Sequence, residues 1–165
     1  MKKLFVLAIM IINTLGCSTK KETDFKKEAL ENTLVSIENK HIKFADILKK
    51  HKGKTVIIDV WASWCSDCIK GMPKVKSLQE QYPNVVYLFI SMDKTYDAWK
   101  SGIQKHQLEG EHYLTSDGMK GVFGKSINLD WIPRYMVVDK TGRIILYKAI
   151  EADDKNLIKT LESLK

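Results

Sequence analysis

The chain has 165 residues, of which 44% are apolar and 28% are charged, close to the composition of soluble globular domains. Its formal net charge of +7 comes from 27 Lys and Arg against 20 Asp and Glu, mixed along the chain, and no nucleic-acid-binding motif accompanies them. The composition excludes a disordered chain, a multi-span membrane protein and a repetitive fibre, and we expect no nucleic-acid partner.

The first 16 residues have the layout of a secretory signal peptide, with a basic start (1–3) and an apolar run (4–12). As a helix this run would span about 14 Å, which is too short for the roughly 30 Å core of a bilayer. Leu15-Gly16-Cys17 resembles the lipobox of bacterial lipoproteins, in which the signal is cut before a lipidated cysteine. We therefore expect export, lipidation of Cys17 and a flexible tether over residues 17–32.

Residues 33–165 are expected to form one domain of alternating strands and helices. The strand-like runs are 33–37, 41–44, 55–61, 85–91, 135–139 and 143–147, and the last two form a hairpin around Lys140-Thr141-Gly142. Helical spacing or helix-end signals mark 45–51, 65–81, 95–106, 116–125 and 156–164. This order predicts an α/β fold in which a mixed central sheet is flanked by helices.

Cys65 and Cys68 form a CxxC motif where the strand 55–61 gives way to a helix. Free backbone N–H groups and the helix dipole stabilise a thiolate at this position, so Cys65 is the expected nucleophile. The spacing brings Cys68 onto the same helix face, where it can close a disulfide. A structural zinc site needs four ligands, and the four His residues fall at no ligand spacing, so we expect no metal. A purely structural disulfide in an oxidising compartment remains the alternative.

Three further features resemble the thioredoxin superfamily: the run VWASWC at 60–65, Pro73 five residues after Cys68, and Ile132-Pro133 before a strand. The resemblance implies a thioredoxin-like fold with extra N-terminal strands, an active-site helix kinked at Pro73, and a cis peptide bond before Pro133. It also implies a substrate groove formed by Trp64, Ile132 and Pro133 beside the disulfide.

Asp59 lies six residues before Cys65, within an apolar strand. Thioredoxins have a buried acid at the matching position that relays the proton of the second cysteine, and a buried carboxylate has a raised pKa that suits a general base near neutral pH. The alternative is an edge position where Asp59 reaches solvent. Ser66 and Asp67, between the cysteines, are expected to tune the redox potential, because Asp67 opposes a nearby thiolate.

Within the superfamily the chain is most similar to the membrane-tethered, extracytoplasmic TlpA/ResA-like branch, through WASWC and residues 131–144. Gly71 stands where the cytochrome-maturation reductases of that branch have Glu, which leaves open whether cytochrome c maturation is involved.

The resemblance implies a thiol–disulfide oxidoreductase that reduces protein disulfides outside the cytoplasm, facing the periplasm or the cell exterior. We expect a monomer that needs no cofactor besides the Cys65–Cys68 pair and is re-reduced by a membrane electron donor. The alternatives of the same fold are a thiol peroxidase, although the chain lacks the PxxxTxxC run of that family, and a copper metallochaperone, although that family uses CxxxC. A binding module with an idle CxxC is a further alternative.

Overall fold

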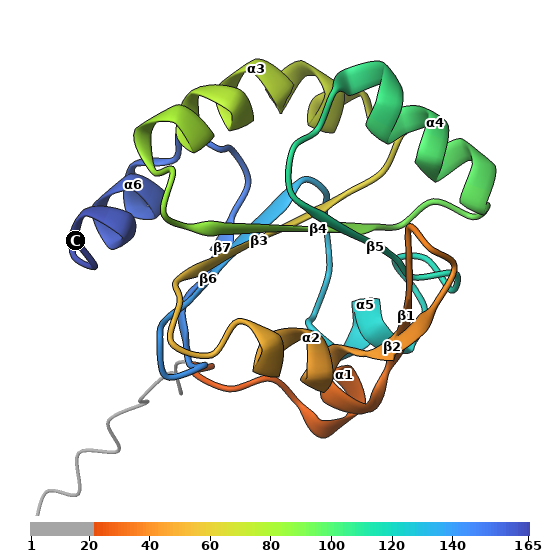
Figure 1. The fold of residues 1–165 in the computed structure, drawn as a ribbon, viewed down its shortest axis with the longest axis horizontal. Coiled ribbons are helices and arrows are strands. Elements are labelled where there is room, and N and C mark those ends of the chain that lie inside the picture. Colours follow the sequence, from red (N-terminus) through yellow and green to blue (C-terminus); the bar gives the residue numbers. More distant parts are fainter. Residues whose placement is uncertain (1–21) are drawn as a thin grey trace, which may run out of the picture.

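The computed structural model of the protein describes residues 22–165 and contains a seven-stranded sheet in the order β2-β1-β5-β4-β3-β6-β7 (Figure 1). β3, β4 and β5 run parallel, and the remaining neighbours are antiparallel. The mixed α/β sheet with added N-terminal strands was therefore predicted correctly. The strands are β1 (Thr33–Ser36), β2 (His41–Lys43), β3 (Val56–Trp61), β4 (Val86–Ser91), β5 (Glu111–Leu114), β6 (Arg134–Val138) and β7 (Ile144–Ala149).

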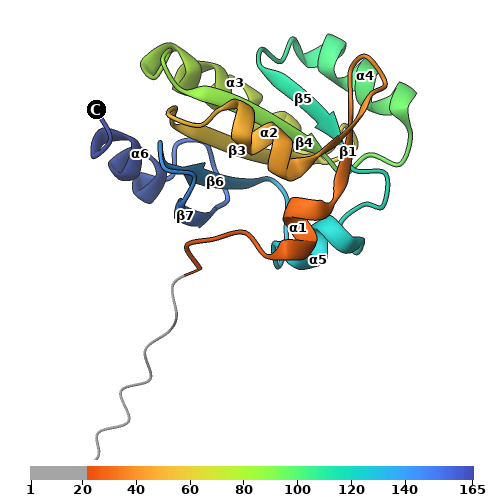
Figure 2. The same cartoon turned by 60° about the horizontal axis from the view of Figure 1, so that its bottom comes forward.

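Helices cover both faces of this sheet (Figures 1 and 2). α3 and α4 lie on one face and α1, α2 and α5 on the other, while α6 packs beside the end of α3, where the Tyr82 hydroxyl donates to Glu162 at 3.0 Å. The helices are α1 (Lys27–Glu31), α2 (Phe44–Lys50), α3 (Ser66–Gln81), α4 (Tyr96–His106), α5 (Val122–Ser126) and α6 (Lys155–Glu162).

β3 is an interior strand of the sheet, between β4 and β6, and all six of its residues are buried. Its nearly continuous apolar sequence follows from this place, because a strand covered on both faces has no solvent side to fill with polar residues. The antiparallel register with β6 sets Asp59 directly opposite Tyr135. The C-terminal end of β3 leads straight into the CxxC segment and α3.

The packed domain reaches further toward the N-terminus than the expected boundary at residue 33. The ring of Phe25 meets that of Phe44 edge-on at 5.0 Å, and Ala29 of α1 is fully buried. The Ile144 amide also donates to the Thr23 carbonyl at 2.7 Å. These apolar positions give the segment a face to bury, so the expectation of a flexible tether up to residue 32 was wrong for residues 22–32. Residues 1–21, which include Cys17, lie outside the described residues.

The structure differs from the expected elements at two places between residues 108 and 126. β5 is a strand where none was expected, since the sequence EHYL has no strand-like alternation of polar and apolar residues. The expected helix 116–125 begins only at Val122, because Gly118 has a left-handed φ of 65° and the Asp117 carboxylate accepts the Val122 amide at 2.6 Å. Asp117 thus fixes a turn and the start of α5 in place of a longer helix.

Candidate active site

Cys65 and Cys68 are joined as a disulfide at the start of α3, with their Cα atoms 5.3 Å apart. Cys65 is the N-cap residue, and its sulfur accepts the Cys68 amide at 3.1 Å, so one free N–H of the helix end already points at it. The residue exposure is 7% for Cys65 and 1% for Cys68. The arrangement offers the Cys65 sulfur to an incoming group and keeps Cys68 behind it.

The segment before β6 lies against this disulfide. The Ile132–Pro133 peptide bond is cis, and the Ile132 carbonyl oxygen is 3.6 Å from the Cys65 sulfur. This contact joins residues far apart in the chain, because β6 pairs with β3, whose end carries the CxxC segment. An extended chain bound along Ile132 would therefore meet the reactive sulfur.

The loop that precedes this segment is held by a buried guanidinium. Arg134 has 1% side-chain exposure and forms an ion pair with Asp130, which also pairs with Lys148. Lys148 holds the pKa of Asp130 at about 2, so the carboxylate is ionised. Arg134 also donates to the carbonyls of Ile127 and Asn128, at 3.5 and 3.4 Å. Sequence reasoning missed this cluster, because an Arg within a strand gives no sign of being buried.

Two exposed tryptophans border the site. Trp64 is 59% and Trp131 57% exposed, and a cavity of about 390 Å³ between them reaches Cys65 and Ile132. Large aromatic side chains left in solvent beside a reactive centre are typical of contact surfaces. Trp64 was among the expected groove residues, and the structure adds Trp131 to them.

Asp59 lies on β3, the strand that leads into the CxxC segment, and is 3% exposed, so it does not reach solvent at a sheet edge. Burial raises the pKa of its carboxyl to about 7, and the Tyr135 hydroxyl acts in the opposite direction by favouring the ionised form. Within the described residues, Asp59 Oδ1 has no hydrogen-bond partner. A carboxyl with these properties exchanges protons near neutral pH.

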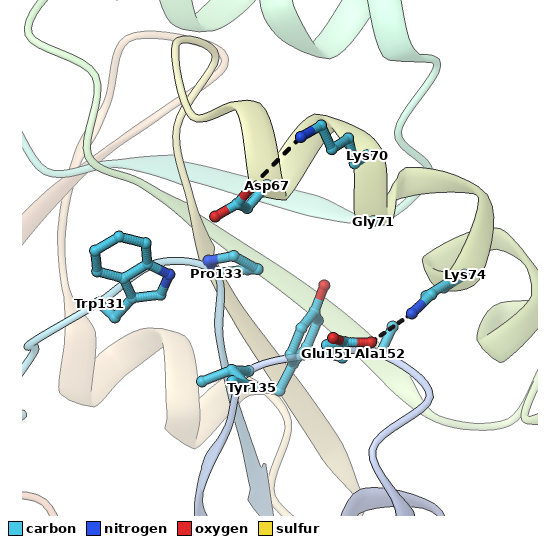
Figure 3. Close-up of a pocket in the computed structure, with 10 residues that line it drawn as sticks. Asp67, Lys70, Gly71, Lys74, Trp131, Pro133, Tyr135, Glu151 and Ala152 are labelled. Atoms are coloured by element: carbon cyan, nitrogen blue, oxygen red, sulfur yellow. Dashed lines mark hydrogen bonds and ion pairs between the residues drawn. The ribbon is translucent and has the colours of Figure 1, made fainter.

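The remaining expected residues lie at the entrance of α3. Asp67 is about half exposed in the first turn, where its side chain lies 4.0 Å from Lys70 (Figure 3). Ser66 is exposed and lines the cavity beside Cys65. Pro73 lies inside α3. Gly71 has no side chain, and a Cβ there would be directed toward the hydroxyl of Tyr135.

A second buried carboxylate fixes the loop that leads to Cys65. Asp93 is 1% exposed and accepts the Ser63 amide at 3.0 Å, the Ser63 hydroxyl at 2.7 Å and the Ser91 hydroxyl at 2.7 Å. Gly102 of α4 lets the helix approach this loop, because a Cβ there would lie 2.7 Å from Ser63 Cβ. Sequence reasoning did not find Asp93, since its partners become visible only when β4 and the loop lie together.

Residues 53–144 match the family model described as thioredoxin-like, so the chain belongs to the thioredoxin-like family. A thiol-disulfide oxidoreductase, ResA, from Bacillus thuringiensis is 29% identical over 133 residues, which cover 79% of this chain and 73% of the relative. A candidate thiol-disulfide oxidoreductase from Bacteroides vulgatus, whose structure was solved in solution, is 30% identical with a TM-score of 0.64, covering 80% of this chain and 82% of that one.

A thiol-disulfide oxidoreductase from Bacteroides fragilis shares the fold, with a TM-score of 0.69 at 21% identity over 83% of this chain and 98% of that one. Together with the Cys65–Cys68 disulfide, these similarities define the protein as a thiol–disulfide oxidoreductase. The prediction made from the CxxC motif and its surroundings is thereby confirmed.

Proposed function

We propose that this protein reduces disulfide bonds of other proteins outside the cytoplasm, with the Cys65–Cys68 pair as its only redox group. The observation that carries the proposal is the combination of a reactive disulfide at a helix start with a buried, titratable Asp59 on the strand that leads into it. A carboxyl that takes up and releases a proton near neutral pH suits the step in which a buried thiol must become a nucleophile.

In the reduced protein, the Cys65 thiolate attacks one sulfur of the substrate disulfide and releases the other as a thiolate, which takes a proton from water. Asp59 then accepts the proton of the Cys68 thiol, and the Cys68 sulfur attacks Cys65 in the mixed disulfide. The substrate's second thiolate leaves, and the protein ends with its own disulfide. Two electrons have moved to the substrate, so a membrane electron donor must return them before the next cycle.

The direction of electron flow depends on charges near Cys65. The start of α3 stabilises the thiolate, which favours a more oxidising pair, whereas Asp67 in the first turn and Asp59, when ionised, oppose it. Each pKa unit is worth about 1.4 kcal/mol, or roughly 30 mV for a two-electron couple. Two carboxylates therefore offset much of the helix contribution, and we expect a potential nearer about −270 mV than about −120 mV.

Equilibration with glutathione tests this direction. Wild-type protein should give a potential below about −170 mV, and Asp67→His should raise it by some tens of millivolts, because a cationic partner for the thiolate replaces an anionic one. Asp97→Asn is a matched control, since it removes an acid from the first turn of α4 instead. A wild-type potential above that limit would indicate a protein that oxidises its partners, and no rise in Asp67→His would refute the electrostatic argument.

We also propose export and membrane anchoring through lipid on Cys17, supported by the apolar run 4–12 and Leu15-Gly16-Cys17. Among the described residues, no helix is long and apolar enough to cross a membrane. In a bacterial host, Cys17→Ser should release the protein from the membrane fraction or leave its signal uncut. Unchanged attachment and processing in that variant would contradict lipidation.

A further inference from the structure

A cavity of about 250 Å³ opens between α3, the cis-proline segment and the loop after β7 (Figure 3). Gly71 lines this cavity from α3 without a side chain, and the side chain of Tyr135 reaches the cavity from β6. A Cβ added at Gly71 would lie 3.9 Å from the Tyr135 hydroxyl oxygen. The Tyr135 hydroxyl therefore ends at the cavity, although the residue as a whole is only 2% exposed.

The same tyrosine is the cross-strand neighbour of Asp59. The two residues are paired directly in the β3–β6 register, so their side chains leave the sheet on the same face, with Cβ atoms about 5 Å apart. Asp59 is 3% exposed, and Oδ1 lacks a hydrogen-bond partner within the described part of the chain. Tyr135 thus connects a carboxyl that water hardly reaches with a cavity that water can enter.

Each catalytic turn requires a path by which a proton leaves Asp59. When Asp59 accepts the Cys68 proton, the carboxylic acid must lose it again before it can serve another turn. Burial and the nearby carboxylates hold the pKa of Tyr135 well above its ordinary range, so its hydroxyl stays protonated and remains a donor. Because donation to the carboxylate favours the ionised form, it also lowers the pKa of Asp59.

We propose that Tyr135 is a positioning residue for Asp59, which orients the carboxylate and relays its proton to water in the cavity beneath Gly71. This inference rests on the proposed role of Asp59 as acceptor of the Cys68 proton. In the relay, the Asp59 acid gives its proton to the Tyr135 oxygen while the Tyr135 hydroxyl proton passes to a cavity water. The carboxylate is regenerated, and Tyr135 ends neutral, as it began.

The other charges around the cavity largely cancel. From α3 come Asp67, Lys70 and Lys74, and from the loop after β7 come Glu151 and Asp153. Lys70 lies 4.0 Å from Asp67, and Lys74 pairs with Asp153 at 3.0 Å and with Glu151. One net negative charge remains, so these groups do not replace a hydroxyl that acts directly on Asp59.

Rapid mixing of the reduced protein with excess dithiobis(nitrobenzoate) isolates the relevant step. The first phase forms a mixed disulfide on Cys65, and the second, independent of reagent concentration, releases another thionitrobenzoate when Cys68 attacks Cys65. In the wild type, this second rate should rise with pH around the Asp59 midpoint of about 7. Tyr135→Phe should raise the midpoint by about one pH unit and slow the step about tenfold below it, since Asp59 loses the hydroxyl that favours its ionised form.

Two further variants separate the possible outcomes. Tyr113→Phe is the matched control, because it removes another buried tyrosine hydroxyl of the same sheet, bonded to Glu111 at 3.1 Å, and should keep the wild-type midpoint. Asp59→Asn should abolish the midpoint. A wild-type pH profile in Asp59→Asn would overturn the proposed role of Asp59, whereas a lost midpoint there with a wild-type midpoint in Tyr135→Phe would overturn only the relay.

Gly71 supplies a test that leaves Tyr135 and Asp59 intact. Gly71→Leu should fill the cavity and slow the second phase more than Gly71→Ala, whose Cβ makes an ordinary contact at 3.9 Å and leaves most of the cavity open. Both replacements favour the helix over glycine, so loss of folding does not explain a slower rate. Equal rates in the two variants and the wild type would contradict the relay.

Discussion

Asp59→Asn should make the oxidised protein more stable at neutral and alkaline pH, although it changes a buried residue. Burial raises the pKa of Asp59 from its ordinary 3.8 to about 7 in the folded protein. Between these values the folded state keeps a proton that the unfolded state has released, so the free energy of unfolding falls as pH rises. At about 1.4 kcal/mol per pH unit, the wild type loses about 4 kcal/mol across this window and nothing further above pH 7.

The asparagine variant does not titrate, so its advantage over the wild type should grow by that amount between about pH 4 and pH 7 and then stay constant. Urea unfolding of the oxidised proteins at several pH values measures the difference. Asp46→Asn is a suitable control, because it removes an exposed carboxylate from α2 and leaves the buried one in place. A difference that is independent of pH, or that grows toward acid, would refute the assignment of a raised pKa to Asp59.

Two further predictions concern the approach to the disulfide. In the reduced protein, limiting iodoacetamide should label Cys65 before Cys68, since of the two only Cys65 combines a helix-start position with residual exposure. Mass mapping measures the order of labelling, and labelling of Cys68 first would make Cys68 the nucleophile instead of Cys65. Asp93→Ala should lower the unfolding free energy by about 2–3 kcal/mol and slow alkylation of Cys65, because the Ser63 amide and hydroxyl lose their acceptor. Urea unfolding and alkylation kinetics measure both effects, and unchanged alkylation would show that the loop holds its position without Asp93.

Asp93 and Tyr135 lie near two different steps of the proposed reaction, the attack by Cys65 and the release of the Cys68 proton. Asp93 restrains the loop on the nucleophile's side, where geometry decides whether Cys65 is presented correctly. Tyr135 lies opposite Asp59 and close to Gly71, one helical turn beyond Cys68, where the proposed relay would set the timing of the proton that Cys68 releases. Substitutions on the first side should therefore change the reaction with substrate, and substitutions on the second should change the pH dependence of release.

The amino-acid sequence determined the features that depend on neighbours along the chain. The strand 55–61 followed by CxxC and a helical pattern is a local signal, because a buried strand and a helix start each have their own residue preferences. The hairpin around Lys140-Thr141-Gly142 is local in the same way, and Gly142 adopts the left-handed φ of 93° that such a turn requires. These signals were enough for the α/β class, the thioredoxin-like fold and the redox chemistry of Cys65 and Cys68.

Only the tertiary structure decided which distant residues meet. β5 is a strand because its backbone completes the parallel ladder beside β4. The sequence of its own four residues does not predict a strand. Ala29 is buried and Phe25 is half-buried because α2 and α5 leave a surface for this segment to cover. Tyr135 faces Asp59 through the β3–β6 register, and a shift of one residue would turn it to the other face of the sheet. Register and packing depend on the whole sheet at once, so the candidate relay could be found only after the strands had been placed.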